Sequence, residues 1–493
     1  MAMQLTKSEF MVGQKHPALL WLKKHNPAAL PAPDASTQAL FDAGHDFEQY
    51  AERQFIGGVA LGFTNYDEYA SLPHRTQRAI DQGAKTLFQG RFEHGELTFI
   101  CDILDIIDGK TVDLYEIKSS TSVHPEHVVD LAFQTIVLEG LDYAVRHISV
   151  IHVNNQYVRN GDVIAEQLTH TVDVTVKVRD AIEPTRQAID RMVAVAKQLD
   201  MPDTSPALAS KNGFKEWLGI YKTLEPYDSG SIYNLASPTP SLIADFEQKG
   251  IKQLVDIPDD YPLTDKQRMQ VKANKQGVPI VDTEKIRDFI AGLQYPIYFL
   301  DYETLGGLVP AFDGLRPYQQ LPFQYSLHVL HAPGAQLEQM EYLHTSNDNP
   351  AQPLVEQLIS DIGTTGSVIV WYEGFEKARN NELATLLPEH APALHAINDR
   401  VVDLMVPFSK QWYVDARFNG SASIKNVLPV LAPELSYKEL DIQEGATAQR
   451  VWMEAVLEGK DPQHKEDVLN NLRTYCGLDT LAMVRIFEFL QKI

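Results

Sequence analysis

The chain has 493 residues, which is long for one hydrophobic core and fits two to four domains of about 100–200 residues each. Apolar residues make up 44% and charged residues 22% of the chain, so a wholly disordered protein is excluded. The 43 basic and 66 acidic residues give a formal charge of −23, which argues against binding nucleic acid through a generally basic surface. Any polyanion must therefore meet local basic patches.

Two cysteines, Cys101 and Cys476, are too few for a disulfide framework or a four-cysteine metal site. A reducing cytoplasm is the expected location. The sequence has no apolar run of the roughly 18 residues that a membrane span needs, and no signal-peptide pattern at its start. We therefore expect a cytoplasmic protein with no membrane partner.

The first predicted domain covers residues 1–200 and mixes helical and strand patterns. Residues 97–104 form an apolar run and Thr111–Lys118 alternates, with a turn at 108–110 between them, so a hairpin is predicted. A helix is expected over 128–138, where apolar residues fall on one stripe, and a strand over 147–153. The predicted order is helices, hairpin, helix and strand.

Residues 201–290 are predicted to connect the two domains, because residues 201–235 are rich in Pro, Ser, Gly and Tyr. The segment 249–258, which begins Lys249-Gly250-Ile251, suggests a helix-hairpin-helix-like unit. A local basic strip follows, and it either neutralises phosphates or forms a solvated helix face. The strip consists of Lys266, Arg268, Lys272 and Lys275.

The second predicted domain covers residues 291–493 and has an α/β pattern. Buried-type strands are expected at 297–300, 322–330 and 367–371, and helices at 376–387, 423–431 and 467–490.

Three residues of the predicted hairpin can form a metal site. Glu116 and Lys118 lie two apart on one strand and so share a face, and in the predicted pairing Asp102 faces the same side. The two carboxylates can hold Mg²⁺ while the lysine lies beside the attacked phosphate. An isolated Glu-x-Lys is a weak signal, so the residues around it carry the assignment.

These residues, with Gly44-His45-Asp46-Phe47-Glu48 upstream and Gln134 downstream, resemble the RecB-like branch of the PD-(D/E)XK nucleases. The resemblance covers residues 1–160 and implies a restriction-endonuclease-like fold. It implies Glu48, Asp102 and Glu116 as metal ligands. Lys118 would be the catalytic lysine, and Gln134 would position substrate or metal. Asp46 and Asp130 stay open as alternative ligands, and Asp105 and Asp113 are assigned to surface or hairpin charges.

The sequence departs from the iron–sulfur relatives within this branch. Nucleases of the CRISPR-associated exonuclease type bind a cluster through one N-terminal cysteine and three later ones. Here His16 stands where the first cysteine is expected, and residues 211–227 contain none of the others. Because a cluster needs thiolates, no iron–sulfur cluster is expected.

A second acidic pattern lies in the second domain. Asp301 and Glu303 follow an apolar strand at i and i+2, so their carboxylates point the same way and can bind a metal pair about 3.5–4 Å apart. Tyr475 and Asp479 lie at i and i+4 of a predicted helix and share one face. Asp479 can complete the site while the phenol orients the attacking water.

These motifs resemble the DEDD exonucleases of the DnaQ-like superfamily, in the subgroup with a Tyr-x-x-x-Asp motif. The resemblance covers residues 290–493 and implies an RNase H-like fold. The family's middle motif, Asn-x-x-Phe-Asp, reads Glu373-Gly374-Phe375-Glu376 here, so Glu376 is the implied ligand and its extra methylene shifts the carboxylate. Asp403 is an alternative ligand.

The segment Ser423-Ile424-Lys425 either contacts phosphate or starts a capped helix.

Together the two domains resemble a bacterial family that fuses a RecB-like nuclease to a DnaQ-like exonuclease. The expected function is hydrolysis of phosphodiester bonds at two sites that use Mg²⁺ or Mn²⁺, the second a 3′–5′ exonuclease. DNA is the expected substrate, and RNA stays open. The alternative is an end-binding or scaffold protein in which one site, more plausibly the second, is inactive.

Overall fold

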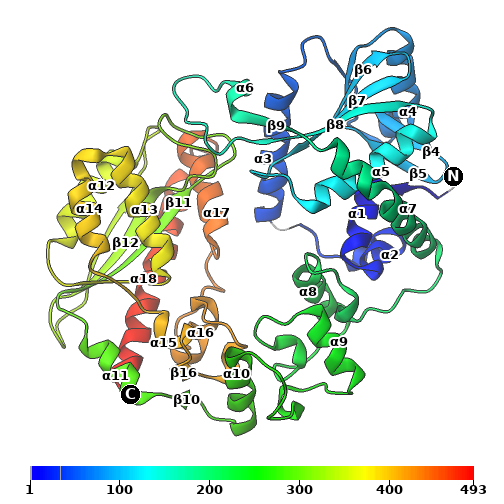
Figure 1. The fold of residues 1–493 in the computed structure, drawn as a ribbon. Coiled ribbons are helices and arrows are strands. Elements are labelled where there is room, and N and C mark those ends of the chain that lie inside the picture. Colours follow the sequence, from blue (N-terminus) through cyan, green and yellow to red (C-terminus); the bar gives the residue numbers. More distant parts are fainter. Residues whose placement is uncertain (1–2, 34) are drawn as a thin grey trace. The chain divides into compact units, whose positions relative to one another are not determined.

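The computed structural model describes residues 3–33 and 35–493. The chain is mixed α/β and divides into two compact units (Figure 1). The first unit comprises Met1–Tyr227, Thr239–Asp245 and Leu308–Tyr318, and the second comprises Asp228–Pro238, Phe246–Gly307 and Gln319–Ile493. None of the helices in the described part of the chain has the length and apolar character needed to cross a membrane.

A six-stranded mixed sheet forms the centre of the first unit. Its strands, in spatial order, are β2 (Val59–Ala60), β3 (Thr86–Phe88), β6 (Ile103–Asp108), β7 (Thr111–Lys118), β8 (Ala144–Val153) and β9 (Thr169–Asp173). A three-stranded sheet accompanies it, made of β1 (Leu5–Thr6), β5 (Leu97–Ile100) and β4 (Arg91–His94).

The predicted hairpin exists as β6 and β7, which pair antiparallel across the turn at Asp108. The Asp108 carboxylate accepts hydrogen bonds from the backbone N–H groups of Lys110 and Thr111, as expected for a turn aspartate. The predicted helix and third strand are also confirmed, as α5 (Pro125–Gly140) and β8. Strand β8 pairs parallel with β7, and α5 makes the crossover between them.

One predicted strand is wrong in its extent. The run 97–104 is two strands, because the chain leaves the ladder at Cys101 and Asp102, and β5 and β6 belong to different sheets. The Asp102 carboxylate accepts a hydrogen bond from the Ile117 N–H at 2.7 Å. This side-chain bond takes the place of a ladder bond at the break.

Two hydrophobic cores cover the two faces of the large sheet. Val112 and Leu114 of β7 lie in a core with residues of α5 and of α7 (Thr175–Lys197), whereas Ile117 lies in a core with residues of α3 (Ala35–Glu52). The alternation of β7 therefore fixes which side chains face α5. Glu116 and Lys118 fall on that face.

The segment Leu308–Tyr318 belongs to the first unit. Leu308 is buried in the core that α3 covers, and Arg159 donates hydrogen bonds to the carbonyls of Pro310 and Ala311, each at 2.8 Å. The Tyr318 hydroxyl donates to the carbonyl of Ser119, directly after β7. A stretch distant in sequence therefore completes this core.

The first unit contains further helices and helical turns. They are α1 (Lys7–Lys15), α2 (Pro17–His25), η1 (Pro27–Ala29), α4 (Tyr66–Asp81), α6 (Ala165–Leu168), η2 (Pro206–Leu208) and α8 (Phe214–Leu224).

Residues 228–291 hold short helices. They are η3 (Ile232–Asn234), α9 (Pro240–Gln248), η4 (Leu254–Asp256), α10 (Asp265–Gln276) and α11 (Thr283–Ala291), with the strand β10 (Ile280–Val281). A left-handed Gly250 follows α9, as expected for a glycine turn. The three-residue η4 follows this turn, and α10 is the next α-helix along the chain.

The basic strip on α10 is partly used within the fold. Arg268 donates to the backbone carbonyl of Leu263 at 3.0 Å, and Lys275 to that of Ile257 and to the carboxylate of Asp259. Half of the four cations therefore hold the chain around α10 together. These hydrogen bonds favour a structural role for Arg268 and Lys275 over phosphate binding.

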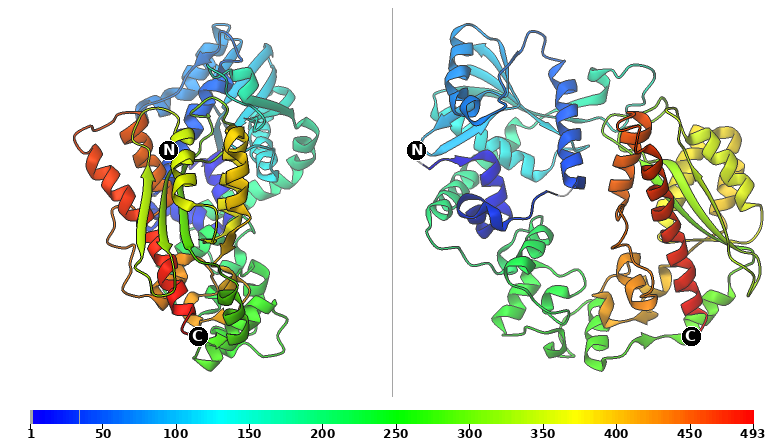
Figure 2. Two further views of the ribbon diagram at one scale, coloured as in Figure 1. Left: turned by 90° about the vertical axis from the view of Figure 1, so that its left-hand side faces the viewer. Right: turned by 180° about the vertical axis from the view of Figure 1, so that it is seen from behind.

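The second unit has a five-stranded sheet between two helical layers (Figure 2). Its strands, in spatial order, are β13 (Glu338–Leu343), β12 (Leu321–Leu330), β11 (Ile297–Leu305), β14 (Ser367–Val370) and β15 (Val401–Asp403). Helices α12 (Ala351–Ile362), α13 (Glu373–Leu386) and α14 (Ala391–Asn398) cover one face, and α17 (Gly445–Trp452) and α18 (Lys465–Leu490) cover the other.

The three strands and three helices predicted for this half are confirmed within a few residues at their ends. Strand β11 extends to Leu305, so Asp301 and Glu303 lie within it and not after it. Phe299 of β11 packs on Phe487 of α18 with ring centroids 5.6 Å apart, which holds the helix to the strand. The other short elements are η5 (Pro388–His390), α15 (Val406–Ser409), β16 (Tyr413–Val414), η6 (Ala416–Phe418), α16 (Ile424–Leu431) and the π-helical η7 (Met453–Leu457).

Candidate functional site

The first unit gathers acidic side chains and two lysines around the end of β7. We call Glu48, Asp102, Glu116 and Asp130, with Lys7 and Lys118, the first cluster. Glu116 Oε1 accepts hydrogen bonds from Lys118 Nζ at 2.6 Å and Lys7 Nζ at 2.8 Å. Its Oε2 accepts from Gln134 Nε2 at 2.5 Å. Lys118 also donates to Asp130 Oδ2 at 2.8 Å.

The two lysines offset the charge of the buried Glu116. Burial would raise the pKa of its carboxyl group, but the ammonium groups of Lys118 and Lys7 outweigh burial and hold that pKa below its usual range. Burial would in turn lower the pKa of Lys118, yet Glu116 and Asp130 raise it. The three groups are therefore a charged network at neutral pH.

Asp102 and Glu48 lie beside this network with less compensation. Burial, reinforced by the charge of Glu116, raises the pKa of Asp102 to about 7, and burial raises the pKa of Glu48. Both side chains line a cavity of about 600 Å³ that Lys7 also lines. Carboxyl groups at a cavity wall that are only partly compensated by neighbouring cations suit a cation from solvent.

The structure brings together all five residues that the first motif implied: Glu48, Asp102, Glu116, Lys118 and Gln134.

Of the alternative acids, Asp130 is buried in the network, since Gln134 Nε2 also donates to its Oδ1, whereas Asp46 is exposed. Asp113 is a hairpin charge, as predicted: it lies on β7, is buried and accepts two hydrogen bonds from Arg146. Asp105 lies in the ladder between β6 and β7.

Lys7 was missed by the sequence analysis. It is the first residue of α1, and Thr6 and Glu9 form a capping box that fixes this helix start. The Thr-x-x-Glu pattern is visible in the sequence and predicts where the helix begins. It does not predict that the first residue meets Glu116, 109 positions later.

His16 has a structural role. Its Nδ1 accepts the Ala18 N–H at 3.1 Å, so its Nε2 carries the proton and donates to the Ser205 carbonyl at 3.1 Å. The ring stacks on Trp217 with centroids 4.0 Å apart. Burial lowers the pKa of His16. The residue therefore ties α2 to the start of the 201–227 segment.

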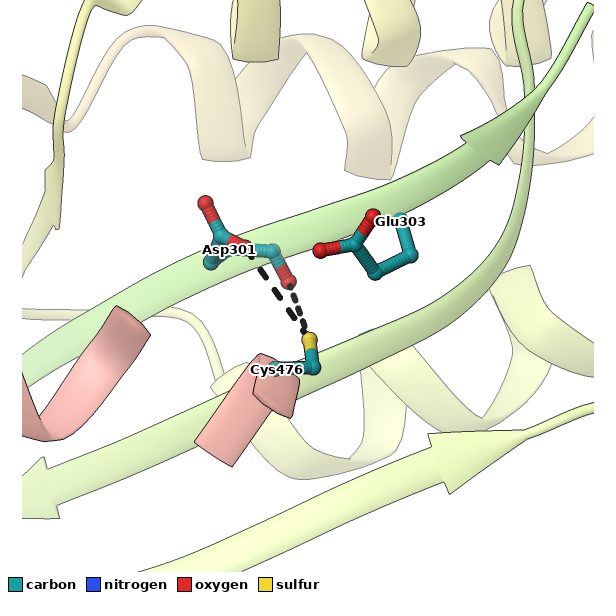
Figure 3. Close-up of side chains that lie close together, drawn as sticks. All are labelled: Asp301, Glu303 and Cys476. Atoms are coloured by element: carbon teal, nitrogen blue, oxygen red, sulfur yellow. Dashed lines mark hydrogen bonds between the residues drawn. The ribbon is translucent and has the colours of Figure 1, made fainter. Parts of the chain in front are cut away.

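A second gathering of acids lies in the second unit, and we call Asp301, Glu303, Glu376 and Asp479 the second cluster. Asp301 and Glu303 come from β11, Glu376 from α13 and Asp479 from α18. Figure 3 shows Asp301 and Glu303 close to Cys476, whose Sγ lies 3.8 Å from the carbonyl oxygen of Asp301. Ligand atoms of Asp301, Glu303 and Cys476 all lie within 4.8 Å of one another, a spacing that a metal ion can bridge.

Burial and mutual repulsion dominate the electrostatics of the second cluster. Burial raises the pKa values of Asp301 and Glu303 well above their usual range, and Asp479 and Asp301, respectively, add to this effect. Burial raises the pKa of Asp479 to about 6, although a hydrogen bond from Tyr437 and the charge of Lys425 oppose the rise. The carboxyl groups of the cluster therefore keep their protons to higher pH than exposed carboxyl groups do, because the neighbouring groups do not neutralise all of them as carboxylates.

Glu376 comes from the first turn of α13, in the helical layer opposite α18. It is buried, its Oε2 has no hydrogen-bond partner in the part of the chain that the structure describes, and burial and the charge of Asp301 raise its pKa. Its neighbour in the motif, Glu373, instead pairs with Lys377 at 2.5 Å. Glu376 is thus the acid that this motif supplies to the cluster.

The alternative ligand Asp403 holds the backbone before α13. Its Oδ1 accepts the Tyr372 N–H at 3.0 Å and the Met405 N–H at 2.9 Å. Tyr372 has a left-handed φ of 80°, which turns the chain into the helix. Asp403 therefore positions Glu376.

Tyr475 and Lys425 line a cavity of about 430 Å³ together with Asp301, Glu303 and Asp479. Tyr475 is buried, and its ring lies 6.3 Å from that of Tyr437. Ser423 is the N-cap residue of α16 but makes no side-chain capping bond, so the expected cap is wrong in that respect. Lys425, from the same segment, is the group that faces the carboxylates.

Tyr437 was missed. Its hydroxyl donates to Asp479 Oδ1 at 2.6 Å from an irregular segment between α16 and α17. No motif or periodicity in that segment marks the residue.

A family model described as "Domain of unknown function (DUF2779)" matches residues 298–423, which contain three of the four acids of the second cluster. The chain is also similar to uncharacterized protein MG366 of Mycoplasma genitalium, with 27% identity over 217 residues that cover 40% of this chain and 32% of that protein. A homologue in Mycoplasma pneumoniae is 26% identical over 235 residues, 44% of this chain and 35% of that protein. Uncharacterized protein UU173 of Ureaplasma parvum is 24% identical over 228 residues, 42% of this chain and 33% of that protein. The matches span about a third of the length of these relatives.

Proposed function

We propose that this chain is a metal-dependent nuclease with two separate sites, the first cluster in a PD-(D/E)XK-like unit and the second cluster in an RNase H-like unit of the DEDD type. One observation carries the proposal. Each motif predicted from the sequence has its acids close enough to interact. Glu116 on β7 acts electrostatically on Asp102 and Glu48, and Asp301 on β11 lies beside Glu303 and interacts electrostatically with Glu376 and Asp479. DNA is the substrate that we propose, and RNA is an outcome of the test.

The donor atoms suit Mg²⁺ or Mn²⁺. Hard divalent cations prefer carboxylate oxygens, and those of Asp301 and Glu303 lie within bridging distance, while burial raises the pKa values of all four acids of the second cluster. Glu376 Oε2, buried without a partner among the described residues, is a donor that a cation would satisfy. In the first cluster Asp102 and Glu48 at the cavity wall, with Glu116, would hold the ion. A bound ion would lower the pKa of a coordinated water and stabilise charge on the phosphate.

In the first site Lys118 is the main side chain that would act on the substrate. Its ammonium is held by Glu116 and Asp130, so it has one orientation before substrate arrives. It would stabilise the negative charge that builds on the attacked phosphate. Gln134 fixes Glu116 through a buried hydrogen bond and so positions the carboxylate.

In the second site Tyr475 would orient the attacking water, since its phenol lines the same cavity as Asp301, Glu303 and Asp479. Burial raises the pKa of Tyr475, so the phenol keeps its proton and acts as a hydrogen-bond donor. Tyr437 would hold Asp479 in place. Removal of single nucleotides from 3′ ends is the proposed reaction.

A second candidate is a nucleic-acid end-binding protein whose second site is inactive. The observation in its favour is the glutamate at position 376, where the resemblance implies an aspartate, because a site of this kind tolerates displacements of only about an ångström.

Release of nucleotides from 3′- and 5′-labelled oligonucleotides, with Mg²⁺ or Mn²⁺ and with EDTA, tests the proposal. Metal-dependent release that EDTA abolishes supports it. A protein that binds the oligonucleotides with metal present and releases nothing would favour the end-binding alternative.

A further inference from the structure

The cavity beside the first cluster is lined by two kinds of side chain. Glu48, Asp102 and Lys7 supply charged groups, and Phe63, Tyr69 and Arg91, which contact one another, supply two aromatic rings and a cation. Its volume of about 600 Å³ lies within the roughly 300–1,000 Å³ typical of small-ligand sites. Charged groups beside aromatic rings suit a ligand that carries both a phosphate and a flat ring.

The aromatic part presents an accessible ring. Phe63 is 46% exposed, which is high for a phenylalanine, and its ring meets Tyr69 edge to face with centroids 5.1 Å apart. The guanidinium of Arg91 lies over the Tyr69 ring, 4.0 Å from its centroid. One face of the Tyr69 ring is therefore covered by the Arg91 guanidinium, and Phe63 lies beside Tyr69 at the cavity wall.

The rings are held in place before any ligand arrives. Arg75 donates to the backbone carbonyls of Leu61 and Gly62, which fixes the loop that carries Phe63. Arg91 donates to the Tyr69 carbonyl at 2.9 Å and to Thr98 Oγ1 at 3.0 Å. A fixed ring loses little entropy when a base stacks on it.

We propose that this cavity is a nucleotide subsite, in which an unpaired base stacks on Phe63 and Tyr69 while Lys7 contacts a phosphate of the same strand. The inference rests on the proposed function, since it places the base next to the phosphodiester that the first cluster would cut. An ammonium group has three N–H donors. Lys7 uses one of them in its hydrogen bond to Glu116, and because it also lines the cavity, another can contact the phosphate.

The subsite makes single-stranded nucleic acid the substrate of the first site. A base enters such a pocket only when it is not stacked and paired in a duplex. Stacking on an aromatic ring tolerates any base, because every base has a flat face. The first site should therefore act on unpaired strands with little sequence preference.

The test is binding without hydrolysis. A short fluorescein-labelled thymidine oligonucleotide and an abasic strand of the same length are titrated with the full-length protein in Ca²⁺ and in EDTA, and fluorescence anisotropy gives Kd. Phe63→Ala should weaken binding of the thymidine strand by about 5- to 150-fold, the usual range for one stacked base. It should leave binding of the abasic strand unchanged, because that strand offers only phosphates.

Two variants control for folding and for general loss of aromatic surface. Phe63→Tyr keeps the ring and should bind like the parent. Phe41→Ala removes a similarly exposed phenylalanine, 52% exposed on α3, that does not line the cavity, and it should have no effect. In a background that carries Asp301→Ala and Glu303→Ala, Phe63→Ala should raise KM and leave kcat nearly unchanged.

Three outcomes overturn the inference: equal Kd values for Phe63→Ala and the parent on the thymidine strand, an equal loss on the abasic strand, or blunt duplex bound as tightly as single strand. Failure of the proposed function looks different. In that case Phe63 still governs single-strand binding, but no strand is cut with Mg²⁺ or Mn²⁺. A parent protein that binds no strand would overturn both.

Discussion

The two acidic clusters differ in how their negative charge is balanced. In the first, Lys7 and Lys118 contact Glu116 at 2.8 and 2.6 Å, and the pKa of this carboxyl group is lowered. In the second, Tyr437 gives Asp479 a neutral hydrogen bond, and burial raises the pKa of the carboxyl groups. The lysines of the first cluster thus neutralise Glu116 from within the chain, whereas burial of the second cluster is offset only in part, by Tyr437 and Lys425.

Because of this difference, the chain offers different chemical groups to a substrate at the two clusters. A lysine fixed by two carboxylates can act directly on a phosphate, so the first site should be most sensitive to loss of that lysine. The second cluster has carboxylates and a phenol, so it should be most sensitive to loss of metal ligands.

The largest expected effect follows from Lys118→Ala, measured with Asp301→Ala and Glu303→Ala also present. Cleavage at the first site should fall by about 10²–10³-fold, the usual effect of removing one preorganised electrostatic group. Initial rates on labelled single strands with Mn²⁺ measure it, and a circular dichroism spectrum controls for folding. Parent-like rates would show that Lys118 takes no part in the chemistry.

Loss of the acids on β11 should remove metal from the second cluster. Calorimetric titration with Mn²⁺, with the first cluster disabled by Glu116→Gln, should show binding that Asp301→Ala with Glu303→Ala eliminates, because hard cations need clustered charge. Asp46→Ala is a matched control, since it removes an exposed acid. An isotherm that keeps its shape in the double variant would argue against a metal site there.

A smaller effect is expected from Tyr475→Phe. It should slow 3′–5′ release by roughly tenfold and spare cutting by the first site, since separate units should act nearly additively. A 3′ phosphorothioate linkage in the substrate should produce the same selective slowing. Should both changes leave release unaffected, the second unit binds ends and does not cut them.

The smallest expected effect is on stability against pH. Because their pKa values are raised, the carboxyl groups of the folded second cluster keep protons that the unfolded chain has already lost. These protons stabilise the fold fully below the ordinary carboxyl pKa. The stabilisation is lost as pH rises through the folded pKa, which is about 6 for Asp479. Glu116 has the opposite sign: its lowered pKa stabilises the fold above the ordinary value and is lost on acidification.

Calorimetry should therefore show that Mn²⁺ raises Tm more at about pH 8 than at about pH 5, because metal replaces the protons that the cluster has lost. Asp301→Asn with Glu303→Gln should remove most of this difference. An equal rise at both pH values would contradict the account of the second cluster.

Local patterns predicted part of the two sites. The two-residue period of a strand placed Glu116 and Lys118 on one face, and both meet α5 through Asp130 and Gln134. The four-residue spacing on α18 likewise placed Tyr475 and Asp479 at one cavity. In each case the geometry lies within one element, so its period is enough.

Contacts between distant segments were not predictable in this way. Lys7 reaches Glu116 across 109 positions, and Tyr437 reaches Asp479 from a segment without regular structure. At the strand break, Asp102 accepts a hydrogen bond from the N–H of Ile117 on β7, 15 positions later. Each needs the tertiary fold, which propensity and spacing do not encode.

The most direct test of two sites is nucleotide release by four proteins with Mn²⁺: the parent, Lys118→Ala, Asp301→Ala with Glu303→Ala, and the combination of all three. Each partial variant should keep the activity of the other site, with 3′–5′ release surviving in Lys118→Ala, and the combined variant should release nothing above background. A combined variant as fast as the parent would contradict the account, because the hydrolysis would then come from neither cluster.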